Sequence, residues 1–234
     1  MLSTAKYGDN KLIINTYTRE CGRMAFAVTI PATRNKASAL PYCQPLFQNE
    51  IEYTGTSTPT GIHRASRITP GHTYMTIPFD QAKMSVVMFL AEILTKTLTY
   101  SEKNDDMYDY IATSLRLLDD RDFKGSNFHI KFLMQLAKYM GFYPANRYSE
   151  YRPCFDLSRS MFVENKLGVK HLITPPYGLI FSQMLDKDFI SCEAITLNGN
   201  SRSYLLEKVL DYYRYHFETL DNIKSLEVLQ QIFH

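Results

Sequence analysis

The sequence predicts an α+β protein, with a small N-terminal β-barrel over residues 1–77 and a mostly helical domain over residues 78–234. Two observations lead to this prediction. Before residue 78, short runs of alternating apolar and polar residues are separated by Gly, Pro and Asn turns, which is the pattern of β-strands. After residue 78, apolar residues recur at spacings of three and four, which is the pattern of amphipathic helices.

The first strands form a predicted meander over residues 6–31. A turn with the sequence GDN at residues 8–10 contains residues that tolerate positive φ. An alternating strand follows over residues 12–17. After a second turn at residues 21–23, the sequence MAFAV places a large apolar side chain at every other position, which predicts a strand with one buried face.

Two more strands complete the predicted barrel. They cover residues 48–54 (QNEIEYT) and 62–69 (IHRASRIT), and a loop rich in Thr, Ser, Gly and Pro separates them at residues 55–61. The pair Pro70-Gly71 ends the second strand.

The predicted barrel is basic. Residues 1–80 contain eight Lys/Arg and five Asp/Glu, a balance of +3, whereas residues 81–234 contain eighteen and nineteen, a balance of −1. A basic surface on a small barrel is typical of the oligonucleotide-binding (OB) fold; the alternative is a solvated barrel with ordinary surface lysines. The residues expected to neutralise DNA phosphates are Lys6, Arg19, Arg23, Arg34, Lys36, Arg64 and Arg67.

Aromatic residues of the barrel are candidates for stacking on bases, a contact worth roughly 1 to 3 kcal/mol. They are Tyr7, Tyr17, Phe26, Tyr42 and Tyr53. Because side chains on a strand alternate between two faces, about half of these rings are expected to point into the barrel instead.

Three helices are predicted in the first part of the helical domain. Residues 80–99 place apolar side chains on one helical face. The second helix is expected to begin at a cap, Asn104 or Asp105, and to end at Leu118. The third is expected to begin at the cap Ser126 and to end at Gly141, a residue suited to the left-handed conformation that ends helices.

The remainder begins with an irregular insert near residues 142–175. This insert is rich in aromatic residues and contains a possible hairpin across residues 156–160. Helical patterns return at residues 176–185, 201–217 and 225–233. Asn200 or Ser201 is the expected cap of the second of these helices.

The chain contains no recognisable catalytic motif. Paired carboxylates at residues 105–106 and 119–120 lie at predicted helix ends, where acidic groups serve caps and turns. His129 has no Cys, His, Asp or Glu within one helical turn, so a core or interface histidine is expected rather than a metal ligand. Walker, GxGxxG and GxSxG sequences are absent. We therefore expect no enzyme; the alternative is a hydrolase that uses Cys154 or a serine with His171.

Cysteine usage indicates a protein without a metal site. The four cysteines, Cys21, Cys43, Cys154 and Cys192, include no CxxC or CxxH spacing, which favours free thiols. No cofactor is expected. The longest apolar stretch, residues 86–94, is too short to span a bilayer, and no basic-then-apolar signal segment is present, so a cytoplasmic location is expected.

Six blocks of the sequence resemble, in order and spacing, the RecO family of bacterial recombination mediators, most closely its Bacteroidetes-like branch. The blocks are YGDNKLIINTYTRECGR, QPLFQNEIEY, IPFDQAKMSVVMFLAEIL, NFHIKFLMQLAKYMGFYP, CFDLSRSMF and LDYYRYHFETLDNIKSLEVLQQIF. The resemblance covers nearly the whole chain. It implies an OB domain before a helical domain and a non-enzymatic role in RecF-pathway DNA repair. That role comprises binding single- and double-stranded DNA, annealing complementary strands and helping to load RecA onto DNA coated with single-stranded-DNA-binding protein.

The implied partners are DNA, RecR, RecA indirectly, and the acidic C-terminal tail of the single-stranded-DNA-binding protein. Such a tail needs an apolar pocket for its aromatic ring and a cation for its terminal carboxylate. The resemblance places this pocket in the helical domain, on the helix over residues 127–140. The residues expected to bind the tail are Phe128, Lys131, Phe132, Gln135 and Lys138. The alternative is that the phenylalanines are core and the lysines solvated.

Two features depart from the family pattern. Many members carry a four-cysteine zinc site after the third helix, whereas only Cys154 and Cys192 lie there in this chain, so no stoichiometric zinc is expected. Members also usually begin with a longer strand before the YGD turn, so the first strand is expected to be trimmed. An alternative function is a scaffold that bridges RecR and the coating protein with weak or no DNA binding.

Overall fold

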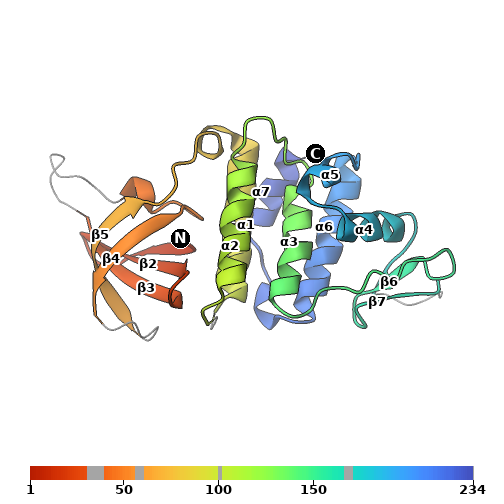
Figure 1. Cartoon of the computed structure of the whole chain (residues 1–234), viewed down its shortest axis with the longest axis horizontal. Coiled ribbons are helices and arrows are strands. Elements are labelled where there is room, and N and C mark those ends of the chain that lie inside the picture. Colours follow the sequence, from red (N-terminus) through yellow and green to blue (C-terminus); the bar gives the residue numbers. More distant parts are fainter. Residues whose placement is uncertain (31–39, 56–60, 100–101, 166–170, 234) are drawn as a thin grey trace. The chain divides into compact units, whose positions relative to one another are not determined.

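The computed structural model describes residues 1–30, 40–55, 61–99, 102–165 and 171–233 (Figure 1). The chain forms two compact units, Met1–Asp120 and Arg121–His234, and each is described by itself. These units are defined by contacts within the chain, so the predicted boundary between a barrel domain (residues 1–77) and a helical domain (residues 78–234) stays a prediction.

A five-stranded sheet, drawn in red and orange in Figure 1, forms much of the first unit. Its strands are β1 (Ser3–Lys6), β2 (Lys11–Thr18), β3 (Gly22–Thr29), β4 (Asn49–Thr54) and β5 (Ile62–Pro70). The spatial order is β1-β2-β3-β5-β4, and neighbouring strands are antiparallel except β3 and β5, which are parallel. Five strands with a crossover between β3 and β5 confirm the predicted α+β class and fit the partly open arrangement of the OB fold.

Strand pairing does not close this sheet into a complete barrel. β1 and β4 are the two edge strands, and no pairing joins them within the described ranges. β1 has only four residues, and all of them pair with β2. A backbone hydrogen bond of 2.8 Å from the N–H of Leu46 to the carbonyl of Met1 connects the regions beside these two edges.

The alternating pattern decides which side chains the sheet buries. In β3, Met24, Phe26 and Val28 are buried while the residues between them are partly exposed, as predicted. Gly8 and Gly22 have φ values of 69° and 71°, which the turns before β2 and β3 require. The buried residues of this core are Ile14, Met24, Phe26, Val28, Cys43 and Ile68.

Helices α1 (Gln81–Thr97) and α2 (Asp105–Leu118) complete the first unit, together with the short 3-10 helices η1 (Leu40–Tyr42) and η2 (Ile77–Phe79). Asp80 caps α1, because its carboxylate accepts hydrogen bonds from the N–H groups of Ala82 and Lys83. Asn104 caps α2 by accepting from the N–H of Met107 at 2.9 Å. Both helices lie where the sequence predicts them.

The second unit combines helices with a small three-stranded sheet. Its helices are α3 (Phe128–Tyr139), α4 (Tyr177–Asp186), α5 (Phe189–Glu193), α6 (Gly199–Arg214), η3 (Glu218–Leu220) and α7 (Ser225–Ile232). The sheet contains β6 (Cys154–Asp156), β7 (Met161–Val163) and β8 (Leu172–Ile173) in the order β7-β6-β8. The antiparallel pair β6 and β7 confirms the predicted hairpin. In the part of the chain described here, no helix is long and apolar enough to cross a membrane.

Two helix starts differ from the prediction. Asn127, not Ser126, occupies the cap position of α3, and its side-chain amide donates to two backbone carbonyls, at 3.0 and 2.8 Å, instead of capping the helix. Asn198, not Asn200 or Ser201, caps α6. The sequence does not predict α5, because five residues are too few to reveal a helical period.

Candidate nucleic-acid interface

Three of the seven predicted DNA-binding cations are exposed on the sheet. Lys6 is the last residue of β1, and Arg64 and Arg67 lie on β5. Arg67 makes an exposed ion pair of 3.5 Å with Glu52 on the neighbouring β4, a pair worth little in water. These side chains are therefore available to phosphate groups.

Arg23 contacts the protein itself. Its guanidinium donates hydrogen bonds to the carbonyl oxygens of Thr95 at 3.1 Å and Leu98 at 3.2 Å, at the C-terminal end of α1. The last carbonyls of a helix have no partner within the helix, and a cation there also faces the negative end of the helix dipole. Burial lowers the pKa of Arg23 below its ordinary value. This arginine joins β3 to α1, and a phosphate would have to compete with that contact.

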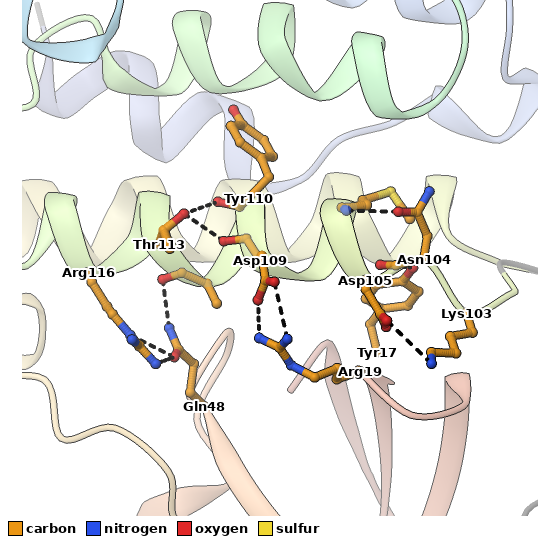
Figure 2. A network of polar contacts seen from close by, with 12 residues as sticks. Tyr17, Arg19, Gln48, Lys103, Asn104, Asp105, Asp109, Tyr110, Thr113 and Arg116 are labelled. Carbon is orange, nitrogen blue, oxygen red and sulfur yellow. Dashed lines mark hydrogen bonds and ion pairs between the residues drawn. The ribbon is translucent and has the colours of Figure 1, made fainter.

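Arg19 is also engaged, by a carboxylate on α2 (Figure 2). Both of its terminal nitrogens donate to Asp109, one of them at 3.1 Å to Oδ2 and the other to Oδ1. The guanidinium carbon lies 5.0 Å from the centre of the Tyr108 ring, within cation–π range. The sequence could not reveal this pair, because its members are 90 residues apart.

Further polar contacts join β2 and the residue before β4 to α2 and to the residues just before it, and those of Gln48 are drawn in Figure 2. The side-chain amide of Gln48 donates to the carbonyl of Ala112 at 2.9 Å, and its oxygen accepts from Arg116 at 3.0 Å. The Tyr17 hydroxyl donates to the carbonyl of Glu102 at 3.2 Å, and burial raises the pKa of Tyr17 to about 12. A cavity of about 430 Å³ lies between these strands and α2.

The remaining predicted cations and rings divide as follows. Arg34 and Lys36 lie outside the described residues. Of the five predicted stacking rings, Tyr17 and Phe26 are buried, and Tyr7 is 64% exposed. Tyr42 and Tyr53 are partly buried, and the Tyr53 ring packs edge-on against Phe26 at 5.3 Å between centroids. Alternation thus places some of the rings in the core, and Tyr7 is the most accessible of the set for a base.

The predicted tail-binding residues on α3 lie mostly in the core. Phe128 and Phe132 are at most 1% exposed, and Phe128 stacks on Phe189 of α5 with ring centroids 4.9 Å apart. Gln135 is partly exposed and Lys138 is exposed. Nine of the twelve residues of α3 are buried, so the helix is apolar on most sides, a pattern that signals a buried helix.

Lys131 has a structural contact that the sequence did not indicate. The residue is 3% exposed, and its ammonium donates to the carbonyl oxygens of Met184 at 3.0 Å and Leu185 at 3.3 Å, near the end of α4. Burial lowers the pKa of Lys131. The ammonium would have to leave these carbonyls to reach a peptide, and its role in tail binding stays a prediction.

The acidic pairs at the helix ends serve structure. Asp119, at the C-terminal cap of α2, accepts hydrogen bonds of 2.8 Å from three backbone N–H groups at residues 75–77. Asp105 and Asp106 lie in the first turn of α2, where acidic side chains face the positive end of the helix dipole. These positions agree with the structural interpretation of both pairs.

The candidate nucleophiles of the hydrolase alternative are buried or bonded to other side chains. Cys154 is fully buried, and burial raises the pKa of its thiol. Ser158 bonds to Asp156, and Ser160 bonds to the Tyr212 hydroxyl at 3.0 Å. His129 is 1% exposed, as expected of a core histidine.

No metal site is formed by the part of the chain that the structure describes. The four cysteines form no disulfide with one another. Within the described ranges, no three His, Cys, Asp or Glu side chains are grouped so that they would hold a metal ion.

Comparisons with known proteins agree on one family. The family described as "Recombination protein O C terminal" matches residues 78–148. Over its whole length the chain is 31% identical to a protein of Phocaeicola vulgatus, 29% identical to one of Flavobacterium psychrophilum and 27% identical to one of Bacteroides fragilis, each named DNA repair protein RecO. Each alignment covers 100% of this chain and 96% of the relative.

Proposed function

The chain belongs to the RecO family of DNA repair proteins, and we propose that it acts there as a recombination mediator that binds DNA and catalyses no reaction. The observation that carries this proposal is the full-length similarity to relatives named DNA repair protein RecO. The open five-stranded sheet with exposed cations supports it, because OB-type sheets are a common platform for nucleic acid.

DNA binding by these exposed cations needs no base-specific contact. Lys6, Arg64 and Arg67 offer exposed positive charge to phosphate groups, and binding is driven by the release of counterions condensed on the DNA. Two strands that bind one basic surface repel each other less than they do in water, which promotes annealing without any covalent step. We therefore propose binding to single- and double-stranded DNA and annealing of complementary strands.

The proposed protein partners are RecR and the acidic tail of the single-stranded-DNA-binding protein. RecA is the proposed indirect partner, which these contacts help to load onto the coated DNA. For the tail, the exposed part of α3 offers Lys138 as the cation and Gln135 as a hydrogen-bonding group beside it. A peptide that ends in acidic residues followed by Pro-Phe carries the complementary charge. While its ammonium is bonded to the α4 carbonyls, Lys131 affects this surface only indirectly, by holding α4 against α3.

A second candidate function is a scaffold that bridges RecR and the coating protein without binding DNA. The contacts of Arg19 and Arg23 favour it, because both guanidinium groups are engaged by the protein's own carboxylate and carbonyl oxygens. DNA binding with a steep salt dependence would exclude this function.

The double variant Arg64→Ala/Arg67→Ala tests the mediator function. We expect it to bind duplex DNA about tenfold more weakly, and the salt slope of binding to fall by about 0.9 for each phosphate that the variant no longer neutralises. Annealing of fluorescently labelled complementary strands should slow in parallel. Arg121→Ala, which removes an exposed arginine of the second unit, is the matched control. An equal weakening in the control, or no acceleration of annealing by the wild-type protein, would contradict the proposal.

A second test concerns the tail peptide. We expect Lys138→Ala to weaken binding of an acidic peptide that ends in Pro-Phe by about 1 to 3 kcal/mol, the contribution of a charge-assisted hydrogen bond, with DNA binding nearly unchanged. Lys131→Met keeps the side-chain volume and is measured beside it. Fluorescence anisotropy gives both affinities. If folded Lys138→Ala protein binds the peptide as the wild type does, the site is not on this part of α3, and the same result for Lys131→Met removes Lys131 from it.

A further inference from the structure

The pair of Arg19 and Asp109 differs from the other cation contacts of the sheet. Arg19 follows the end of β2, and its guanidinium faces α2, where both oxygens of the Asp109 carboxylate accept from it (Figure 2). Arg67 has only a single long contact to a carboxylate, and Arg23 contacts carbonyl oxygens instead. Of these three arginines, Arg19 is thus the one that bonds to both oxygens of a carboxylate.

A carboxylate in this fork geometry presents two oxygens as a phosphate group does. Arginine recognises both groups through two parallel N–H···O bonds. The Tyr108 ring next to the guanidinium holds its plane in place through a cation–π contact. Arg19 is therefore already oriented to receive a phosphate, and Asp109 occupies the place that the phosphate would take.

The contact is also one that a ligand is able to displace. The side chains of Arg19 and Asp109 are each 48% exposed, so water and ions reach both of them. Exposed ion pairs contribute little to stability, because water screens the charges and two side chains lose conformational freedom. A DNA strand, with a charge on every nucleotide, supplies a stronger field than one carboxylate does.

We propose that Asp109 competes with DNA phosphate for Arg19 and thereby sets the DNA affinity of the sheet. The inference rests on the proposed DNA-binding function and adds Asp109 and Tyr108 of α2 to it. In the free protein Arg19 is paired with Asp109, and on DNA it turns to a phosphate. Other acidic groups nearby, Glu20, Asp105 and Asp106, repel DNA in general but make no bond to Arg19 among the contacts of the described residues.

The test is Asp109→Asn, compared with Asp106→Asn. Both substitutions remove one negative charge from α2, but Asp106 does not contact Arg19. We expect Asp109→Asn to bind a single-stranded oligonucleotide about two- to fivefold more tightly than Asp106→Asn does, the equivalent of one exposed ion pair. Its salt slope should become steeper by up to about 0.7, the value for one further phosphate neutralised on a single strand. Circular dichroism melting curves verify that both variants are folded.

A third variant identifies Arg19 as the group that is released. In an Arg19→Ala background, Asp109→Asn should raise affinity no more than Asp106→Asn does, because no guanidinium remains to be freed. Equal increases for the two variants in the wild-type background, or an increase from Asp109→Asn that survives in Arg19→Ala, would overturn the proposal. If the wild-type protein itself binds no DNA, the proposed function fails; if it binds and Asp109→Asn binds no more tightly, only the competition by Asp109 fails.

Discussion

The substitution Asp119→Asn is expected to destabilise the first unit by about 2 to 4 kcal/mol, because it weakens charge-assisted hydrogen bonds to buried donors. The Asp119 carboxylate accepts from the N–H groups of Met75, Thr76 and Ile77, each at 2.8 Å, and the residue is 8% exposed. An asparagine amide would direct N–H groups at one or more of these donors. Lys83 of α1 binds the same region through Thr76, so the contact also fixes the start of α1.

The pH dependence of stability gives this prediction a second signature. Burial by itself raises the pKa of Asp119, but the three backbone N–H donors outweigh it, so the pKa is lowered from its ordinary value of 3.8. A depressed carboxyl pKa contributes stability that is fully present above the unfolded value and is lost as pH falls through the folded value. The wild-type protein should therefore lose stability below about pH 4, and Asp119→Asn should lose less over the same range.

Hydrogen exchange locates the effect. In Asp119→Asn, the amides of residues 75–77 should exchange faster, and urea unfolding followed by circular dichroism should shift to lower concentration. The chain contains no Trp, so circular dichroism is a more useful signal of unfolding than tryptophan fluorescence. Asp106→Asn, at an exposed position of the same helix, is the control. Unchanged protection of residues 75–77 would show that Asp119 does not hold this segment.

The second large effect concerns His129 in α3. Burial, followed by the charge of Arg202, lowers the pKa of His129 to about 3. The residue is 1% exposed, and its ring lies 5.2 Å from the Phe233 ring. The folded protein therefore keeps His129 neutral at a pH at which the unfolded chain takes up a proton. Stability is lost as pH falls from about 6.5 toward the folded value, by about 1.4 kcal/mol for each pH unit well inside this window.

The substitution His129→Gln should remove this dependence. Between about pH 6.5 and 5, where most carboxylates stay ionised, the wild-type free energy of unfolding should fall and that of His129→Gln should fall much less. His216→Gln is measured beside it, because burial also lowers the pKa of the more exposed His216, and it should remove less of the slope than His129→Gln does. An equal slope in wild type and His129→Gln would show that His129 is not the group that titrates.

The sequence predicted the helices well because their signals are local. The cap Asn104 and the spacing of apolar residues lie within a few positions of the helix start. The alternation in β3 likewise identified its buried face. The open edge between β1 and β4 was not predictable, because it depends on pairing between distant segments.

The candidate site was harder to predict for the same reason. Arg19 and Arg23 resemble free surface cations in the sequence, but their partners lie 72 to 90 residues away. In the sequence, Lys131 lies on the same helical face as Lys138, which suggests that it is exposed. Only the fold reveals the α4 carbonyls beside it. Nearly continuous apolar residues on both sides of Lys131 were the one local sign of its burial.

The central claim is that the exposed cations of the sheet bind DNA through its phosphates. The most direct measurement is the binding of wild-type protein to single-stranded and duplex oligonucleotides of equal length over a series of salt concentrations. If Lys6, Arg64 and Arg67 each contact a phosphate, the logarithm of the duplex binding constant should fall against the logarithm of salt with a slope of about −2.7 or steeper. It should do so equally for unrelated sequences. Binding that is undetectable at low salt, or that does not change with salt, would contradict the claim.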